Sequence, residues 1–292
     1  MNILKTTLIA GAAAMLSPFS FAAEAAPAAD AQPQPAQKSF LSADKFSASV
    51  SFGFESNYVF RGIREAQDSL QPEVEVAYAL TDALGAYASV FNNSPLDHNY
   101  TETDINLGLT YQVAAFTFDL GYTLYWNTSL GPKKAVKFDT TNELKVGVSY
   151  DTSEILGDFA VTPSLYYFYD FDMECNTVEF SLDYSAPISK WILGEDKDFL
   201  SIDTSLYAGY RNGSRFLIGD GQGGRMVYHD SCGYTYVGIN ADLVLRINEI
   251  CSVSFGLRWA NVNAHTSAAT GTAPFGTYAD TVWYGTSMCI GF

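Results

Sequence analysis

Acidic side chains that alternate with apolar ones are the residues of this chain best suited to chemistry. Glu73 and Glu75 are two positions apart and Glu179 and Asp183 are four apart, so each pair points to one face of an extended strand. Carboxylates gathered on the inner face of a pore attract cations and repel anions. The candidate selectivity residues are the six carboxylates in such segments: Glu73, Glu75, Glu143, Glu179, Asp183 and Asp203.

Two segments resemble catalytic motifs, but their surroundings argue against catalysis. Gly219, Gly221 and Gly224 have the spacing of a dinucleotide-binding loop, which requires a following helix, and none is expected. Residues 228–231 place His, Asp and Ser side by side, where an extended chain points neighbours to opposite faces. The histidines, His98, His229 and His265, are all expected in loops. We therefore predict no catalytic, metal or cofactor site, and no enzyme activity.

Period-two alternation recurs from residue 46 to the C-terminus, with an apolar or aromatic residue at every second position. Membrane strands with alternating lipid-facing and lumen-facing side chains have this pattern. The predicted strands are 46–60, 70–80, 84–91, 105–113, 116–126, 144–150, 159–169, 178–184, 200–210, 237–247, 253–259 and 284–292. The sequence thus predicts an all-β fold, a closed antiparallel membrane barrel of about twelve strands. Ten or fourteen strands are the alternatives if residues 211–231 extend as a hairpin.

The composition favours a membrane barrel over a soluble β-sandwich. Charged residues are 16% of the chain, below the quarter typical of soluble domains, and no apolar run is long enough for a membrane helix. A bilayer accepts only structures that satisfy every backbone polar group internally, which leaves a closed sheet. Aromatic residues also mark both strand ends, as interfacial girdles do: Tyr58, Phe60, Trp126, Tyr169 and Trp259 at one end, and Phe46, Tyr111, Phe116, Tyr150 and Phe292 at the other.

The lengths of the connections predict the orientation of the barrel. Short connections at 81–82, 112–115, 151–157 and 248–249 alternate with longer ones at 61–69, 92–103, 127–140, 211–231 and 261–277. Connections 170–174 and 185–198 are exceptions to this alternation. Bacterial barrels have short periplasmic turns and longer external loops, so both termini are expected in the periplasm.

The two ends of the chain indicate export to the outer membrane. Lys5 and the apolar stretch that follows predict a signal peptide over residues 1–22, because the stretch is too short to span a membrane. Residues 23–44, rich in Pro, Ala and Gln, are expected to be a disordered periplasmic tail before a barrel over 45–292. Phe292 ends the final strand, and a terminal aromatic residue of this kind is the expected signal for the barrel assembly machinery.

Residues 54–63 resemble the opening motif of the TorF family of porins, which are outer-membrane proteins without a settled ligand. The family pattern of Ser, Tyr and Phe-Arg-Gly at fixed spacing is matched in order by Ser56, Tyr58, Phe60, Arg61 and Gly62. The resemblance implies a barrel and a channel. The Arg61 guanidinium either extends to lipid headgroups or turns inward to pair with an acidic residue of the lumen.

The charge balance narrows the expected partners. A net charge of −16 argues against nucleic acid, and inward positions carry roughly ten acids against four bases. We expect a porin-like channel in the bacterial outer membrane that contacts the lipid bilayer and passes small hydrophilic solutes, with cations or neutral solutes preferred. The alternative is a non-conducting structural or adhesion barrel that acts through its external loops.

The four cysteines give one prediction and one open question. Cys251 and Cys289 have opposite parity on neighbouring strands, so their thiols should be free. Cys175 and Cys232 both fall at outer strand ends, and whether they form a disulfide is left open.

Overall fold

The computed structural model describes residues 45–96, 100–129, 140–194, 197–219, 225–264 and 280–292. The predicted signal peptide (1–22) and N-terminal tail (23–44) lie outside these residues. The strands are β1 (Phe46–Phe60), β2 (Ile63–Ala79), β3 (Leu84–Pro95), β4 (Tyr100–Val113), β5 (Phe116–Ser129), β6 (Thr140–Tyr150), β7 (Val161–Asp170), β8 (Cys175–Ala186), β9 (Leu200–Gly219), β10 (Arg225–Arg246), β11 (Cys251–Ala264) and β12 (Asp280–Gly291). The helical segments are α1 (Ser153–Leu156), η2 (Gly157–Phe159) and α2 (Ile188–Leu193).

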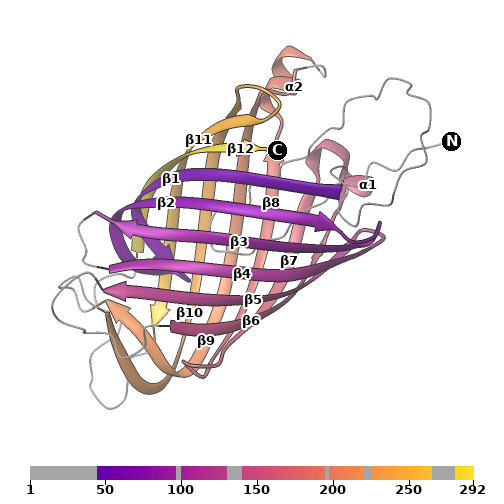
Figure 1. Cartoon of the computed structure of the whole chain (residues 1–292). Coiled ribbons are helices and arrows are strands. Elements are labelled where there is room, and N and C mark those ends of the chain that lie inside the picture. The colour runs from indigo at the N-terminus through magenta and orange to yellow at the C-terminus, as the bar shows by residue number, and fades with distance from the viewer. Residues whose placement is uncertain (1–44, 97–99, 130–139, 195–196, 220–224, 265–279) are drawn as a thin grey trace.

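Each strand pairs antiparallel with its sequence neighbours, and β1 pairs with β12, which closes the barrel (Figure 1). The prediction of a closed antiparallel barrel of twelve strands is therefore confirmed. The prediction of a long loop over 211–231 is wrong, because β9 and β10 continue their pairing as far as Gly219 and Arg225. This extension lengthens two strands and adds none to the count.

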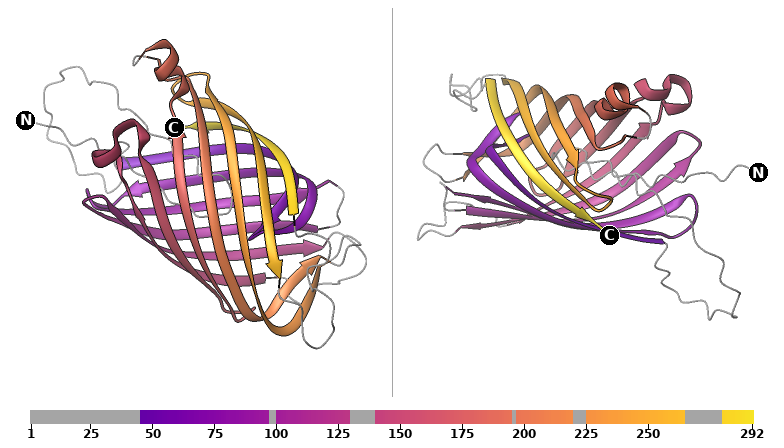
Figure 2. Two further views of the ribbon diagram at one scale, coloured as in Figure 1. Left: turned by 180° about the vertical axis from the view of Figure 1, so that it is seen from behind. Right: turned by 90° about the horizontal axis from the view of Figure 1, so that it is seen from above.

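The two chain ends of the barrel meet on one rim. The Ala48 and Phe292 main chains exchange two hydrogen bonds, with N···O distances of 3.2 and 2.8 Å. We call this rim, which also carries α1 and α2, the terminal end, and the opposite rim the loop end (Figures 1 and 2).

Alternation along the strands places apolar side chains outside and polar ones inside. Phe52 is 52% exposed, Leu107 53% and Leu257 60%, whereas their neighbours in sequence are shielded by the barrel. A bilayer requires such an outer surface, since lipid-facing side chains must be apolar. Among the described residues, no helix has the length and apolar character that a membrane span requires.

One segment leaves the barrel wall at the loop end. β1 pairs with β12 only as far as Glu55, and β2 pairs with β3 only from Ser69 onward. Between these points residues 56–68 pair with each other across a two-residue turn at Arg61 and Gly62. We call residues 56–68 the inner hairpin, because it folds into the lumen (Figures 1 and 2).

The inner hairpin corrects two predictions. Residues 61–69 are not an external loop, since β2 begins at Ile63. Tyr58 and Phe60 are not at the membrane interface: Tyr58 is 4% exposed, and Phe60 packs beside it in the interior. Backbone geometry produces the change of direction, because Asp68 has a positive φ of 46° and the β1–β2 register shifts between Tyr58 and Val59.

Candidate functional site in the barrel interior

The inner hairpin contacts both sides of the lumen. The Tyr58 hydroxyl donates a hydrogen bond to Glu102 Oε1 of β4 at 2.7 Å, and the Phe60 ring packs edge-on against Tyr125 of β5. On the other side, Val59 packs with Ala260 of β11 and Trp283 of β12. The hairpin is therefore supported by walls on both flanks.

Arg61, at the tip of the inner hairpin, binds the wall that faces β1. Its two terminal nitrogens donate to the two carboxylate oxygens of Glu143 at 2.6 and 2.7 Å, and the side chains are only 2% and 3% exposed. The guanidinium carbon lies 4.8 Å from the Phe60 ring centre and 4.5 Å from that of Phe168 on β7. β7 is six strands from β1 in either direction, so the hairpin crosses the lumen.

The Glu143 carboxylate is held by a second donor. The Tyr125 hydroxyl donates to Glu143 Oε1 at 3.0 Å, so the carboxylate accepts from both Arg61 and Tyr125. A planar guanidinium matches a carboxylate bidentately and stacks on aromatic rings, which a lysine ammonium does not. The Glu143 carboxylate and the flanking aromatic rings therefore suit an arginine at position 61 better than a lysine.

Gly62 and Ser56 allow the inner hairpin to approach the barrel wall closely. Gly62 has φ of 77°, and a Cβ on it would lie 2.6 Å from Tyr236 Cβ and 2.6 Å from Val262 Cγ2. Only glycine tolerates both this backbone conformation and this approach. Where β1 leaves β12, the Ser56 hydroxyl accepts a hydrogen bond from the Tyr284 N–H at 3.0 Å. The motif residues that match the TorF pattern all take part in the hairpin's contacts.

Two further basic residues, Lys145 and Arg258, neutralise part of the acidic interior through three ion pairs. Lys145 Nζ lies 2.7 Å from Asp119 Oδ2, near the rings of Tyr87 and Tyr166. Arg258 lies between two acids, 3.1 Å from Glu55 and 2.8 Å from Asp242. These pairs join strands that are adjacent or one strand apart, and they line the inner wall.

The predicted selectivity carboxylates lie in two different settings. Glu143 is neutralised by Arg61. Glu179 accepts a hydrogen bond from the Tyr236 hydroxyl at 2.6 Å, Asp183 from Ser181 at 2.9 Å and Asp203 from Ser185 at 2.5 Å. Glu73 and Glu75 lie on β2 between the inner hairpin and the terminal end. Among the described residues, these carboxylates other than Glu143 form no ion pair.

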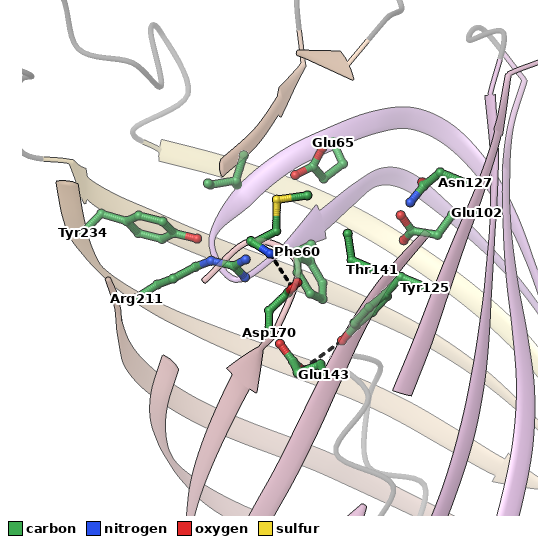
Figure 3. A pocket seen from close by; sticks show the side chains of 12 residues that line it. Phe60, Glu65, Glu102, Tyr125, Asn127, Thr141, Glu143, Asp170, Arg211 and Tyr234 are labelled. Carbon is green, nitrogen blue, oxygen red and sulfur yellow. Dashed lines mark hydrogen bonds between the residues drawn. The ribbon is translucent and has the colours of Figure 1, made fainter. Parts of the chain in front are cut away.

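A pocket of about 50 Å³ lies beside the inner hairpin, and Figure 3 shows the side chains that line it. Phe60, Ile63 and Glu65 form its hairpin side. The rest is formed by Met173 of the β7–β8 turn and by residues from β4, β5, β6, β7, β9 and β10, including Glu102, Asp170, Arg211 and Tyr234. A space of this size holds a few water molecules, whereas pockets for small organic ligands are several times larger. The hairpin and the wall that lines this pocket therefore leave room for little more than water between them.

Sequence reasoning missed the wall residues that receive the hairpin. Glu102 was expected in a loop, yet it lies on β4 with the inward parity of Asp104. Tyr234 and Tyr236 lie on β10, before the predicted start of that strand at 237. Extending the period-two pattern toward the loop end would have placed all three inside the barrel.

Inward tyrosines lie flat over inward glycines on neighbouring strands. The cross-strand pairs are Tyr87 with Gly108, Tyr166 with Gly147, Tyr236 with Gly209 and Tyr207 with Gly238. A Cβ at Gly147 would lie 2.0 Å from the Tyr166 ring, so the ring occupies the space that a side chain would need. Tyr166 and Tyr207 are therefore packed on the inner wall.

A Gly147→Val variant should be less stable by about 1–3 kcal/mol, because the new side chain displaces the Tyr166 ring from a packed interior. The temperature at which the folded band disappears on a gel should fall. A Gly53→Ala variant is the control, since its Cβ would approach no atom closer than 3.4 Å. Equal stability of the Gly147→Val variant and the wild type would contradict the packing role of Tyr166.

The histidine and cysteine predictions have different outcomes. His229 lies within β10, paired with Arg215, so its expected position in a loop is wrong. His98 and His265 lie outside the described residues. Cys251 and Cys289 carry free thiols, as predicted. Cys175 and Cys232 both lie opposite Gly213, two strands apart. That separation, about 10 Å, exceeds the Cα distance that a disulfide spans.

The fold is similar to those of several solved barrels. LpxR from Salmonella typhimurium aligns over 84% of this chain and 99% of its own, with 8% identity and a TM-score of 0.50. The KdgM porin aligns over 84% and 99% with 10% identity and a TM-score of 0.45, and an outer-membrane channel from Pseudomonas putida F1 over 89% and 100% with 12% identity and a TM-score of 0.46. Such identities concern the fold alone. No curated protein sequence matches the chain.

The closed barrel with an apolar outer surface identifies the chain as a bacterial outer-membrane protein. The sequence profile of a family described as "Bacterial protein of unknown function (Gcw_chp)" matches residues 39–286, which is more than half of the chain and includes the inner hairpin. The narrower TorF name stays a prediction from the motif. The chain belongs to the Gcw_chp family of bacterial proteins of unknown function.

Proposed function

We propose that this protein is an outer-membrane channel for small hydrophilic solutes, with a preference for cations or neutral solutes over anions. The observation that carries the proposal is the inner wall, where Glu73, Glu75, Glu179 and Asp183 form no ion pair among the described residues. In this proposal the terminal end faces the periplasm and the loop end the outside. No catalytic step is part of it.

The carboxylates retain their influence at physiological salt. The Debye length there is about 8 Å, so a cation that passes along the inner wall comes within screening distance of several of these groups. Arg61, Lys145 and Arg258 already pair with four other carboxylates of the interior, so these bases do not offset the charge of the carboxylates named above. Rings of carboxylates favour cations in this way in other channels.

Replacing Glu73 and Glu75 together with Gln should lower the cation-over-anion permeability ratio roughly twofold to fivefold, because two fixed charges near the path are removed. The measurement is the reversal potential of open channels in a KCl gradient, which should move toward zero. As a control, a Glu154→Gln, Glu249→Gln double variant makes the same change in net charge at the terminal end, in α1 and in the β10–β11 turn. An anion-selective wild type, or an equal shift in both variants, would contradict the assignment.

The inner hairpin itself favours a second candidate function, a non-conducting surface barrel that acts through its external loops. A lumen filled by its own chain needs no water path, and residues 56–68 cross this lumen. The two functions differ in conductance. A correctly folded wild type that stays silent in planar bilayers under all voltages would favour the surface role.

A further inference from the structure

We propose that the inner hairpin is a gate, and that the Arg61–Glu143 pair is the latch that holds it closed. The inference rests on the proposed channel function and adds its regulation. In the closed state residues 56–68 cross the lumen from the β1 side to the β6–β7 side. In the open state the hairpin swings back into the wall and leaves the carboxylate-lined path free.

The hairpin is built as a unit separate from the wall. Its ladder pairs, from Asn57 with Gln67 to Phe60 with Ile63, are made between its own two strands. At its base, the Asp68 carbonyl accepts a main-chain hydrogen bond from the Leu96 N–H at 2.9 Å, which marks the hinge. Beyond this hinge its contacts with the wall are made by side chains: Tyr58 with Glu102, Phe60 with Tyr125, and Arg61 with Glu143. A unit of this kind can move as a rigid body when its side-chain contacts break.

The wall offers the hairpin a second place to bind. β12 continues past Gly285, its last residue paired with β1, as far as Asp280, and among the described strands β11 alone pairs with this extension. The Tyr284 N–H points to the β1 side, where it meets the Ser56 hydroxyl. Main-chain groups two and four residues along a strand point the same way, so Val282 and Asp280 face the β1 side with main-chain groups that pair with no strand among the described residues there.

The register of that second position follows from the existing one. Val50 pairs with Ile290 and Glu55 with Gly285, so a continued ladder would set Tyr58 opposite Val282 and Phe60 opposite Asp280. Tyr58 and Phe60 have the parity of Phe52, which is 52% exposed on the lipid side. They would then join an aromatic girdle, where such residues are favoured. The same sequence therefore suits both positions.

The closed state depends on arginine chemistry and on backbone strain. Arg61 and Asp68 have positive φ values of 49° and 46°, which non-glycine residues rarely adopt. The bidentate pair with Glu143 and the stacking of Arg61 on Phe60 and Phe168 offset that strain. Loss of the guanidinium removes the latch and leaves the strain.

The gate is tested by single-channel recording of full-length barrels in planar bilayers. The wild type should switch between closed and open levels. An Arg61→Ala variant should raise the ratio of open to closed time at least tenfold. The ratio for Arg61→Lys should lie between those of the wild type and Arg61→Ala, because lysine keeps the positive charge but cannot bind the Glu143 carboxylate bidentately. A third variant replaces residues 56–68 with Asn-Gly, a two-residue turn that suits the neighbouring pair Glu55 and Ser69, and it should stay open.

An Arg246→Ala variant is the matched control. Arg246 pairs with Asp198 at the terminal end, where both side chains are a third or more exposed, so its loss removes one arginine and leaves the gate intact. Retention of the folded band on unheated gels shows that each variant is a barrel.

The outcomes separate the gate from the channel. Equal, steady conductance of the wild type, the Arg61→Ala variant and the hairpin deletion would overturn the gate and leave the channel standing. If the wild type and the Arg61→Ala variant are silent and the hairpin-deletion variant conducts, the hairpin is a fixed plug. This result would overturn the gate and the proposed channel function. A folded deletion variant that does not conduct would also overturn both.

Discussion

A Gly62→Val variant is expected to stay in the open state, because the closed state has no room for the new side chain. A Cβ at Gly62 would lie 2.6 Å from both Tyr236 Cβ and Val262 Cγ2, distances that packed atoms do not adopt. The backbone φ of 77° is strained for a β-branched residue by about 1–3 kcal/mol besides. Single-channel recording should show long openings and few closures, as in the hairpin deletion.

The control for Gly62→Val is Gly157→Val, which imposes the strain without the collision. Gly157 has φ of 57° in the turn between β6 and β7, and a Cβ there would meet no atom within 4 Å. This variant should lose some stability and gate like the wild type. Gating of the Gly62→Val variant that matches the wild type would show that the hairpin docks differently from the closed state described above.

The number of strands and the direction in which their side chains face were predictable, because contact with lipid constrains the residue type at each alternate position of a strand. Each strand within the bilayer must carry apolar groups at alternate positions, so a local pattern contains the fold. Val50, Phe52 and Val74 follow this pattern, and all three are exposed on the outside. This requirement for apolar residues ends where a strand extends beyond the hydrocarbon core of the bilayer. Residues 211–219 and 225–233, with Arg211, Asn212 and Gly213, lack the pattern and still form strand.

The inner hairpin was not predictable because its sequence satisfies two environments. Tyr58 and Phe60 at the end of β1 fit an interfacial girdle as well as they fit the lumen. Their partners are distant in sequence: Glu102 is 44 residues from Tyr58, and Glu143 is 82 residues from Arg61. Local periodicity contains no information on such pairs. The sequence indicated that Arg61 could turn inward and pair with an acidic residue of the lumen, but it did not indicate that this residue is Glu143.

The same limit applies to the carboxylates of the lumen. Parity placed Glu143 with Glu73 and Glu75 on the inner face, and it treated them as equivalent. The structure separates them, because Glu143 is bonded to Arg61 whereas Glu73 and Glu75 form no ion pair among the described residues. Which acids are neutralised depends on contacts between distant segments, and a one-dimensional pattern does not specify them.

Replacing Phe292 with Ala is expected to lower the amount of barrel in the outer membrane severalfold while leaving the folded barrel nearly as stable. Phe292 is 72% exposed, so its ring contributes little to packing. Its main chain closes the barrel through two hydrogen bonds with Ala48, and alanine retains both. A large loss must then arise before folding is complete, when we infer that the assembly machinery binds the last strand.

The control for this prediction is Phe46→Ala, which removes a ring of the same size from the same rim. Phe46 begins β1, is 51% exposed and pairs with Tyr78, so its loss tests the effect of apolar area at the terminal end without touching the last strand. Immunoblots of outer-membrane fractions measure the amount, and the folded band on unheated gels measures stability. The Phe46→Ala variant should reach nearly the wild-type amount, because assembly would depend on the terminal aromatic residue and not on rim hydrophobicity. Equal losses in the two variants, or a Phe292→Ala variant at the wild-type amount, would show that Phe292 is not the assembly signal.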